Sequence, residues 1–218
     1  ALLGVDGLND EQRKNGVATF SGGNHALAVS WASRQCGVSA KVIMPQTADP
    51  IRISGCEEMG AEVILTDDIA SASEILQEIA KAESRTILHP FNDLNMAYGA
   101  ASCGAEFIED MPEADVFIIP VGGGGLIAGM AAAIKHFNPA IEVIGVEPQG
   151  ANSLRRSFLS GRPESLDKVQ TIADSLGAPS ALAESFQLAR ANVDQVIEIE
   201  DKVMIHTMLQ MRDRLNLF

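Results

Sequence analysis

The chain has 218 residues, enough for one large domain or two small ones, and a hydrophobic content of 46% that can supply a core. Its net charge of −13 disfavours nucleic acid and anionic membranes as partners. No apolar stretch approaches the roughly 20 residues of a membrane-spanning helix, and no basic segment typical of a signal peptide opens the sequence. Three widely spaced cysteines fit free thiols in a reducing compartment, so we expect a cytoplasmic protein.

Strand-like and helix-like segments alternate along the sequence. A short helix capped by Asn9 opens the series. Apolar runs then predict strands at 17–20, 40–45, 61–66, 86–90, 115–119, 141–146 and 195–200. Helical spacing predicts helices at 25–34, 50–59, 69–82, 95–109, 127–137, 150–160, 180–191 and 201–214, with Trp31 and Met130 at core positions. This alternation is typical of an α/β protein with largely parallel sheets.

The most informative feature is a run of four glycines followed by a leucine: Gly122, Gly123, Gly124, Gly125 and Leu126. The run joins a predicted strand to a predicted helix. Glycine tolerates positive φ and has no Cβ to block a ligand, and the N–H groups of such a turn form an anion site at the positive end of the helix dipole. The sequence therefore predicts a phosphate-binding loop, with a flexible connection as the alternative. The spacing matches a dinucleotide-binding fingerprint poorly.

A second glycine-containing turn, Ser21-Gly22-Gly23-Asn24-His25, also joins a predicted strand to a predicted helix. Backbone N–H groups at this helix start suit a carboxylate. The side-chain amide of Asn24 can donate a hydrogen bond to a ring substituent or accept one from it. The alternative is an ordinary N-cap, in which Ser21 or Asn24 caps the helix.

The two turns, in this order, resemble those of the fold-type-II pyridoxal-phosphate enzymes, and among these the threonine/serine dehydratases and serine racemases. Further matches to the same pattern lie at 41–45, 60–63, 89–93, 121–129, 138–139, 143–148 and 171–174. The resemblance implies two parallel-sheet, three-layer domains of the tryptophan-synthase-β-like type, incomplete at both ends. By this resemblance, part of the large domain and a linker lie at 1–15, the small domain at 16–93, and the large cofactor-binding domain at 94–218.

The resemblance also implies roles for individual residues. The phosphate of the cofactor, pyridoxal phosphate, would be held by the N–H groups of Gly122, Gly123, Gly124, Gly125 and Leu126. The 3-hydroxyl of the pyridine ring would be hydrogen-bonded by Asn24. The substrate carboxylate would be received at the helix start by Ser21, Gly23, Asn24 and His25.

The sequence departs from the family at several places, and three of these concern catalysis, racemisation and metal binding. The family forms its Schiff base through a lysine in a Ser-Phe-Lys-x-Arg-Gly type stretch, and none of the six lysines here lies in such a context. We therefore identify no catalytic residue within the chain and expect that lysine upstream of Ala1, in a longer polypeptide. Gly22 stands where serine racemases carry a second serine that moves a proton, which disfavours racemisation. Glu147 matches a carboxylate that can join a divalent-cation site, but Ser153 replaces its expected partner, so we expect no metal.

The resemblance implies a pyridoxal-phosphate-dependent lyase that dehydrates threonine, serine or another hydroxy amino acid to a 2-keto acid and ammonia by β-elimination. The partner would be a small amino-acid substrate, with neither nucleic acid nor membrane, and the full-length protein would form a homo-oligomer such as a dimer. The alternatives are a serine-racemase-like enzyme, or a non-catalytic regulatory or binding fragment that lacks the lysine.

Overall fold

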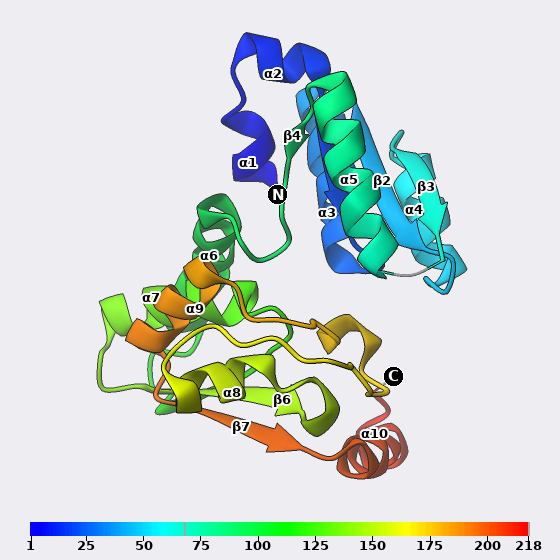
Figure 1. The fold of residues 1–218 in the computed structure, drawn as a ribbon. Coiled ribbons are helices and arrows are strands. Elements are labelled where there is room, and N and C mark those ends of the chain that lie inside the picture. Colours follow the sequence, from blue (N-terminus) through cyan, green and yellow to red (C-terminus); the bar gives the residue numbers. More distant parts are fainter. Residues whose placement is uncertain (68, 218) are drawn as a thin grey trace. The chain divides into compact units, whose positions relative to one another are not determined.

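The computed structural model describes residues 1–67 and 69–217 and divides the chain into two compact units, Ala1–Gly99 and Ala100–Phe218 (Figure 1). Each unit is built on one parallel sheet with helices packed against it. The α/β class with parallel sheets is therefore confirmed. The assignment of 1–15 to the large domain stays a prediction, although Val5 and Leu8 pack in the core of the first unit.

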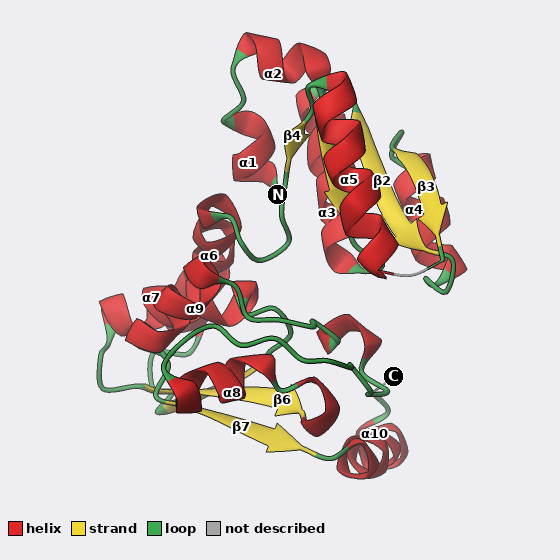
Figure 2. Cartoon of the chain, viewed as in Figure 1, coloured by secondary structure: helices red, strands yellow, loops and turns green. Residues whose placement is uncertain are grey.

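The first unit has four parallel strands in the order β3-β2-β1-β4 (Figure 2). The strands are β1 (Val17–Phe20), β2 (Ala40–Pro45), β3 (Glu62–Thr66) and β4 (Thr86–Ile87). The helices are α1 (Leu2–Asp6), α2 (Asp10–Asn15), α3 (Asn24–Cys36), α4 (Pro50–Glu58) and α5 (Ile69–Glu83). Asn9 caps α2 in a capping box with Gln12, as the sequence predicts.

Helices cover both faces of this first sheet. Alternate residues of β1 and β2 point to opposite faces, as the two-residue period of a strand requires. On one face Val17 and Val42 pack with Val29 of α3 and Cys56 of α4. The opposite face has its own cluster, made by Ala18, Ile43, Ala72 and Leu76, the last two from α5.

The second unit has three parallel strands in the order β5-β6-β7. The strands are β5 (Val116–Pro120), β6 (Glu142–Pro148) and β7 (Gln195–Ile199). The helices are α7 (Gly125–Phe137), α8 (Ser153–Ser160), α9 (Ala183–Asn192) and α10 (Asp201–Leu215), with short 3₁₀ turns η1 (Gln149–Ala151) and η2 (Asp174–Leu176). Helix α6 (Leu94–Asp110) runs across the division between the units. Phe117, Ile119, Val143 and Val196 pack against α7 and α9 on one face of this sheet.

Several details differ from the sequence prediction. Strand β4 ends at Ile87 instead of residue 90, and α8 begins at Ser153 instead of residue 150. Trp31, expected in the core, is 46% exposed, whereas Met130 is buried as predicted.

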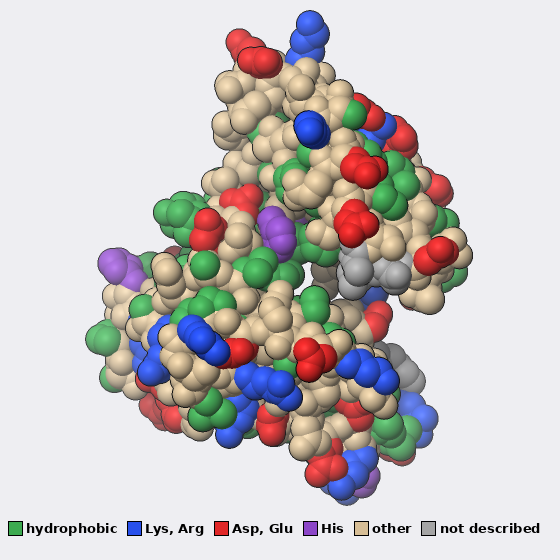
Figure 3. All heavy atoms as spheres, in the orientation of Figure 1, with side chains coloured by type: hydrophobic (Ala, Val, Ile, Leu, Met, Phe, Trp, Pro, Cys, Tyr) green, Lys and Arg blue, Asp and Glu red, His purple; other side chains and the backbone are tan. Residues whose placement is uncertain are grey.

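No helix within the described residues is long and apolar enough to cross a membrane. On the face drawn in Figure 3, acidic and basic side chains are interspersed.

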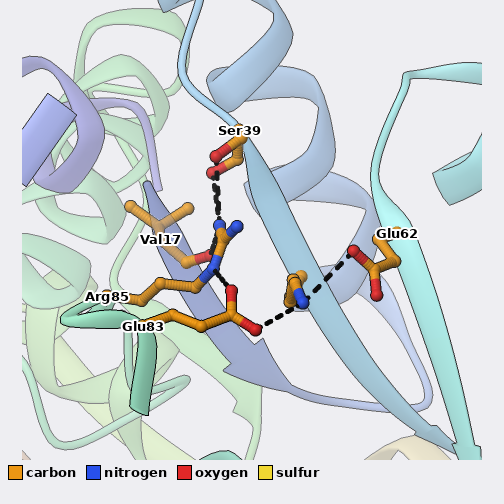
Figure 4. A network of polar contacts seen from close by, with 6 residues as sticks. Val17, Ser39, Glu62, Glu83 and Arg85 are labelled. Carbon is orange, nitrogen blue, oxygen red and sulfur yellow. Dashed lines mark hydrogen bonds and ion pairs between the residues drawn. The ribbon is translucent and has the colours of Figure 1, made fainter. Parts of the chain in front are cut away.

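A polar network ties the first unit together where its strands begin (Figure 4). Arg85 donates from Nε to the Glu83 carboxylate at 2.7 Å and from Nη1 to the carbonyl oxygens of Val17 and Ser39, both at 3.3 Å. The other carboxylate oxygen of Glu83 accepts from Lys41 Nζ at 2.6 Å, and this hydrogen bond raises the pKa of the lysine. The network links β1 and β2 to the end of α5.

Gly16 makes room for this network. Its φ is +85°, a conformation that favours glycine, and a Cβ at this position would collide with Ser39 and the Arg85 guanidinium. The residue before β1 is therefore glycine for a steric reason as well as a conformational one.

We predict that Arg85→Ala lowers the free energy of unfolding by about 1–3 kcal/mol, because it removes the hydrogen bonds that Arg85 donates to the Val17 and Ser39 carbonyl oxygens and to the Glu83 carboxylate. Lys81→Ala, at an exposed position of α5, is the matched control and should change it by less than about 0.5 kcal/mol. The measurement is denaturant unfolding of both variants. Equal effects of the two substitutions would contradict the structural role of Arg85.

Candidate cofactor-binding site

The four-glycine loop lies where β5 passes into α7. Strand β5 places Phe117 and Ile119 in the core of the second unit, which fixes the strand just before the loop. Gly124 is the N-cap of α7 and has a φ of +86°, a left-handed conformation that glycine adopts without strain. The chain therefore turns from strand to helix at a residue without a side chain.

The N–H groups of this loop are available to bind a ligand. From Gly122 to Leu126, no backbone N–H donates to an acceptor within the part of the chain that the structure describes. The first bond of the helix comes at Ala128, whose N–H donates to the Gly124 carbonyl at 3.0 Å. The first turn of α7 carries no acidic residue. Several free N–H groups at the positive end of a helix dipole are suited to a phosphate.

Two neighbouring segments enclose the loop. A Cβ added at Gly122 would lie 3.2 Å from the Cα of Leu176 in η2, and one added at Gly124 would lie 3.6 Å from Ser185 of α9. The Ser185 hydroxyl lies 3.1 Å from the Gly123 carbonyl oxygen and anchors the loop from outside. These contacts join segments far apart in sequence, so the sequence pattern carried no signal for Leu176 or Ser185.

The second predicted turn lies in the first unit, between β1 and α3. Gly23 is the N-cap of α3, and its N–H donates to the Ser21 hydroxyl at 3.1 Å. No side chain caps the helix, so Ser21 stabilises the turn itself and the N-cap alternative is wrong. The N–H groups of Asn24 and His25, and the Asn24 side-chain amide, make no hydrogen bond within the described residues. This helix start therefore has donors available for an anion.

His25 is held as a neutral imidazole. Its Nε2 lies 3.1 Å from the carbonyl oxygen of Leu88, and because a carbonyl can only accept, Nε2 carries the proton. Burial lowers the pKa of His25 to about 4. The other ring nitrogen, Nδ1, is therefore left as an acceptor at neutral pH.

His89 supports the loop that follows β4. Its Nδ1 accepts the N–H groups of Phe91 and Asn92, at 3.3 and 3.0 Å. Its ring packs edge-on against Phe20 and Phe91. Burial lowers the pKa of His89, which keeps Nδ1 free to accept. These contacts give this histidine a structural role.

Glu147 lies at the end of β6 and is completely buried. Its two carboxylate oxygens accept the N–H groups of Leu154 and Arg155, at 2.9 and 2.7 Å, and so fix the start of α8. Burial raises the pKa of Glu147 to about 7. No group of three or more potential metal ligands comes together among the described residues. In this chain the carboxylate caps a helix.

The candidate residues thus divide between the two units. Ser21, Gly23, Asn24 and His25 lie together in the first unit. The loop from Gly122 to Leu126 lies in the second.

Known proteins share this chain's sequence and fold. The family described as "Pyridoxal-phosphate dependent enzyme" matches residues 1–218. The chain belongs to this family. A phenylserine dehydratase from Ralstonia pickettii is 41% identical over 96% of the chain and 64% of its own length. An L-threonine ammonia-lyase from Thermotoga maritima is 35% identical over 93% of the chain and 51% of its own length.

A solved structure shows the fold. Maize serine racemase superposes on 99% of the chain and 66% of its own chain, with a TM-score of 0.92 and 31% identity. The fold is therefore the tryptophan-synthase-β-like fold that the sequence predicted. The chain spans about half to two thirds of the length of these relatives.

The cofactor of the family is pyridoxal phosphate, and the glycine loop fits its phosphate group. The free N–H groups from Gly122 to Leu126 match a phosphate's need for several donors. These glycines have no side chain that could block a phosphate. A Cβ at Gly122 would also press on the backbone of Leu176. The individual roles of these residues, and of Asn24, stay predictions.

We predict that Gly124→Asp abolishes binding of pyridoxal phosphate to the chain. The substitution forces a side chain into a left-handed position and places a negative charge beside the anion site. Calorimetric titration with pyridoxal phosphate measures the effect. Gly161→Asp is the control, since this glycine also has positive φ but has no atom within 4 Å of its added Cβ. Unchanged affinity in Gly124→Asp would refute the assignment of the loop.

We also predict that Glu147 makes stability fall as pH rises. Its pKa is about 7 in the folded chain and near the ordinary 4.5 when unfolded, so between these values only the folded chain holds the proton. From pH 5 to 8, the wild type should lose roughly 3 kcal/mol of unfolding free energy relative to Glu147→Gln. His25 acts oppositely, because its lowered pKa makes stability rise through pH 4 to 6.5. The wild-type-minus-variant difference isolates Glu147, and a difference that does not change with pH would contradict the prediction.

Proposed function

We propose that this chain is the greater part of a pyridoxal-phosphate-dependent dehydratase that acts on a 3-hydroxy-2-amino acid. The observation that carries the proposal is the set of unpartnered N–H groups from Gly122 to Leu126 at the start of α7. A loop of this kind holds the phosphate of the cofactor, and the family supplies the cofactor's identity.

The substrate class is inferred from the relatives. The names of similar proteins include phenylserine, threonine and serine. All three compounds carry an amino group, a carboxylate and a hydroxyl on the neighbouring carbon. A dehydratase removes that hydroxyl by β-elimination and yields a 2-keto acid and ammonia. The cytoplasmic location and the homo-oligomeric state expected from the sequence stay predictions.

The residues of this chain would bind and orient the reactants. The N–H groups of Asn24 and His25 would receive the substrate carboxylate, with Ser21 and Gly23 completing the turn. The Asn24 amide would hydrogen-bond the ring 3-hydroxyl. Neutral His25 would keep this helix start free of a titrating charge near pH 7, because its pKa is about 4. When bound, pyridoxal phosphate supplies an electron sink for negative charge at the substrate Cα.

The proton at Cα needs a base, and the lysines of this chain are poor candidates. Lys41 is held by Glu62 and Glu83, which raise its pKa and keep it charged. Lys135 donates to the Ile141 carbonyl and pairs with Asp194, both at 2.7 Å. Lys202 pairs with Glu200, and Lys14, Lys81 and Lys168 are exposed. We therefore place the base in a part of the longer polypeptide outside these residues.

Gly22 favours dehydration over racemisation. A racemase needs an acid or base on each face of Cα, and glycine has no side chain to supply the second one. Space at this position is limited as well, since an added Cβ would lie 3.2 and 3.3 Å from the ring carbons of Pro45. The elimination step needs no second proton-transfer residue at this position.

The test uses the longest polypeptide that the source makes from this sequence. Incubated with pyridoxal phosphate and L-threonine, L-serine or L-phenylserine, it should release keto acid and ammonia from at least one. Chiral chromatography of the remaining amino acid should find no D-enantiomer. Binding of pyridoxal phosphate without turnover would favour the non-catalytic alternative, and a D-enantiomer would favour the racemase.

The 218-residue chain by itself should bind pyridoxal phosphate without turning over any of these substrates. An ordinary lysine amine is protonated at neutral pH, and a flexible surface position forfeits the advantage of a fixed geometry, about 7–11 kcal/mol in well-oriented systems. Borohydride reduction followed by peptide mapping reports any covalent attachment. Stoichiometric labelling of one lysine, whose replacement also abolished keto-acid formation, would place the base within this chain.

A further inference from the structure

A buried serine of α9 lies directly beside the glycine loop. Ser185 is 4% exposed, and its neighbours Phe186 and Ala189 belong to the core of the second unit. A hydroxyl in such surroundings costs free energy unless it is hydrogen-bonded. Its Oγ lies 3.1 Å from the Gly123 carbonyl oxygen and 3.2 Å from that of Leu182. The hydroxyl therefore has two acceptors within reach and one proton to donate.

The two acceptors differ in what else they bind. The Leu182 carbonyl already accepts the Phe186 N–H at 2.9 Å, in the first turn of α9. The Gly123 carbonyl accepts no other hydrogen bond within the described residues. Since the Leu182 carbonyl has a donor without Ser185, the hydroxyl proton stabilises the structure more when Ser185 donates it to Gly123.

This hydrogen bond fixes a peptide group that has little else to hold it. The peptide bond joins Gly123 to Gly124, so neither residue has a Cβ that opposes its rotation. The contacts of the preceding strand end at Val121, whose N–H donates to a carbonyl of β6 at 2.9 Å. The helical hydrogen bonds of α7 begin at the N–H of Ala128. Between these two points, the Ser185 hydroxyl gives the loop a fixed contact.

The orientation of this peptide group decides whether the loop offers a donor there. In a trans peptide the C=O and the N–H point in opposite directions. A Gly123 carbonyl turned toward Ser185 therefore turns the Gly124 N–H away from α9, as one of the free donors of the loop. The reverse orientation would place the carbonyl oxygen among those donors, and its partial negative charge would repel a phosphate.

We propose that Ser185 is a positioning residue for the phosphate of the cofactor. Its hydroxyl holds the Gly123 carbonyl on the side of the loop that faces α9, and so keeps the Gly124 N–H available for the phosphate. Ser185 acts through the backbone and not by contact with the cofactor. This inference rests on the proposed function, because it requires that the loop binds that phosphate.

The substitution Ser185→Ala, in the longest polypeptide that the source makes, tests this role. Alanine is a strong helix former, so α9 should keep its fold. We expect the Kd values for pyridoxal phosphate and for inorganic phosphate to rise about fivefold, the factor that corresponds to one lost hydrogen bond. Calorimetric titration of the cofactor-free polypeptide measures both. The two probes should lose affinity together because both use the same N–H groups.

The matched control is Ser157→Ala. Ser157 is a completely buried serine of α8 in the same unit, and its hydroxyl donates to the Ser153 carbonyl at 2.7 Å. Both substitutions should lower the Tm slightly, because each removes a buried hydrogen bond. Only Ser185→Ala should weaken binding of the two phosphate-bearing probes. Equal losses of affinity in the two variants overturn the inference.

Pyridoxal, which lacks the phosphate, distinguishes a positioning role from a general loosening of the site. Wild type and Ser185→Ala should bind it with equal affinity, and a parallel loss for pyridoxal overturns the inference. If the wild type binds neither pyridoxal phosphate nor inorganic phosphate, the assignment of the loop fails and the proposed function fails with it. If wild type and Ser185→Ala bind both equally well, this inference alone fails.

Discussion

The turn at Gly124 is the constraint on which the candidate site depends. A parallel strand delivers the chain to one edge of the sheet, and the helix that follows begins there with N–H groups that its own backbone cannot satisfy. In most proteins a capping side chain accepts them. Here neither α3 nor α7 has one, and both begin at a glycine N-cap. Both of these helix starts are therefore uncapped, at a cost in helix stability that a bound anion can offset.

Two buried ionisable side chains lie near helix starts and treat the free N–H groups there differently. Glu147 accepts the first N–H groups of α8, so that helix start is closed by the chain itself. His25 lies at the start of α3 but uses its Nε2–H on the Leu88 carbonyl, leaving the helix N–H groups free. The comparison explains why α8 is a structural helix start and α3 a candidate binding one. The type of residue alone, a carboxylate or an imidazole, does not decide between these roles.

Most of the fold could be predicted because helices and strands depend on residues close together in sequence. Side chains alternate with a period of two in a strand, and Asn9 and Gly37 mark the start of one helix and the end of another. Strand β4 was predicted too long because the Leu88 carbonyl is taken by the Thr19 hydroxyl and His25. The start of α8 was misplaced because Glu147 determines it from outside the helix. The prediction that Trp31 lies in the core was wrong because helical spacing alone does not show which face is buried. The errors at β4 and α8 come from side-chain contacts made outside the element itself.

The same limit applies to the candidate site. The glycines could be found because only glycine suits the turn at Gly124, whereas Ser185 and Leu176, which enclose it, reach it through the tertiary fold. For the lysines, the sequence and the structure lead to the same conclusion. Sequence context removes all six from the family's catalytic position, and the ion pairs of Lys41 and Lys135 give a physical reason for two of them. A side chain that holds strands and helices together as a fixed cation cannot also serve as a neutral base. The proposed function therefore places its base in chain outside these residues.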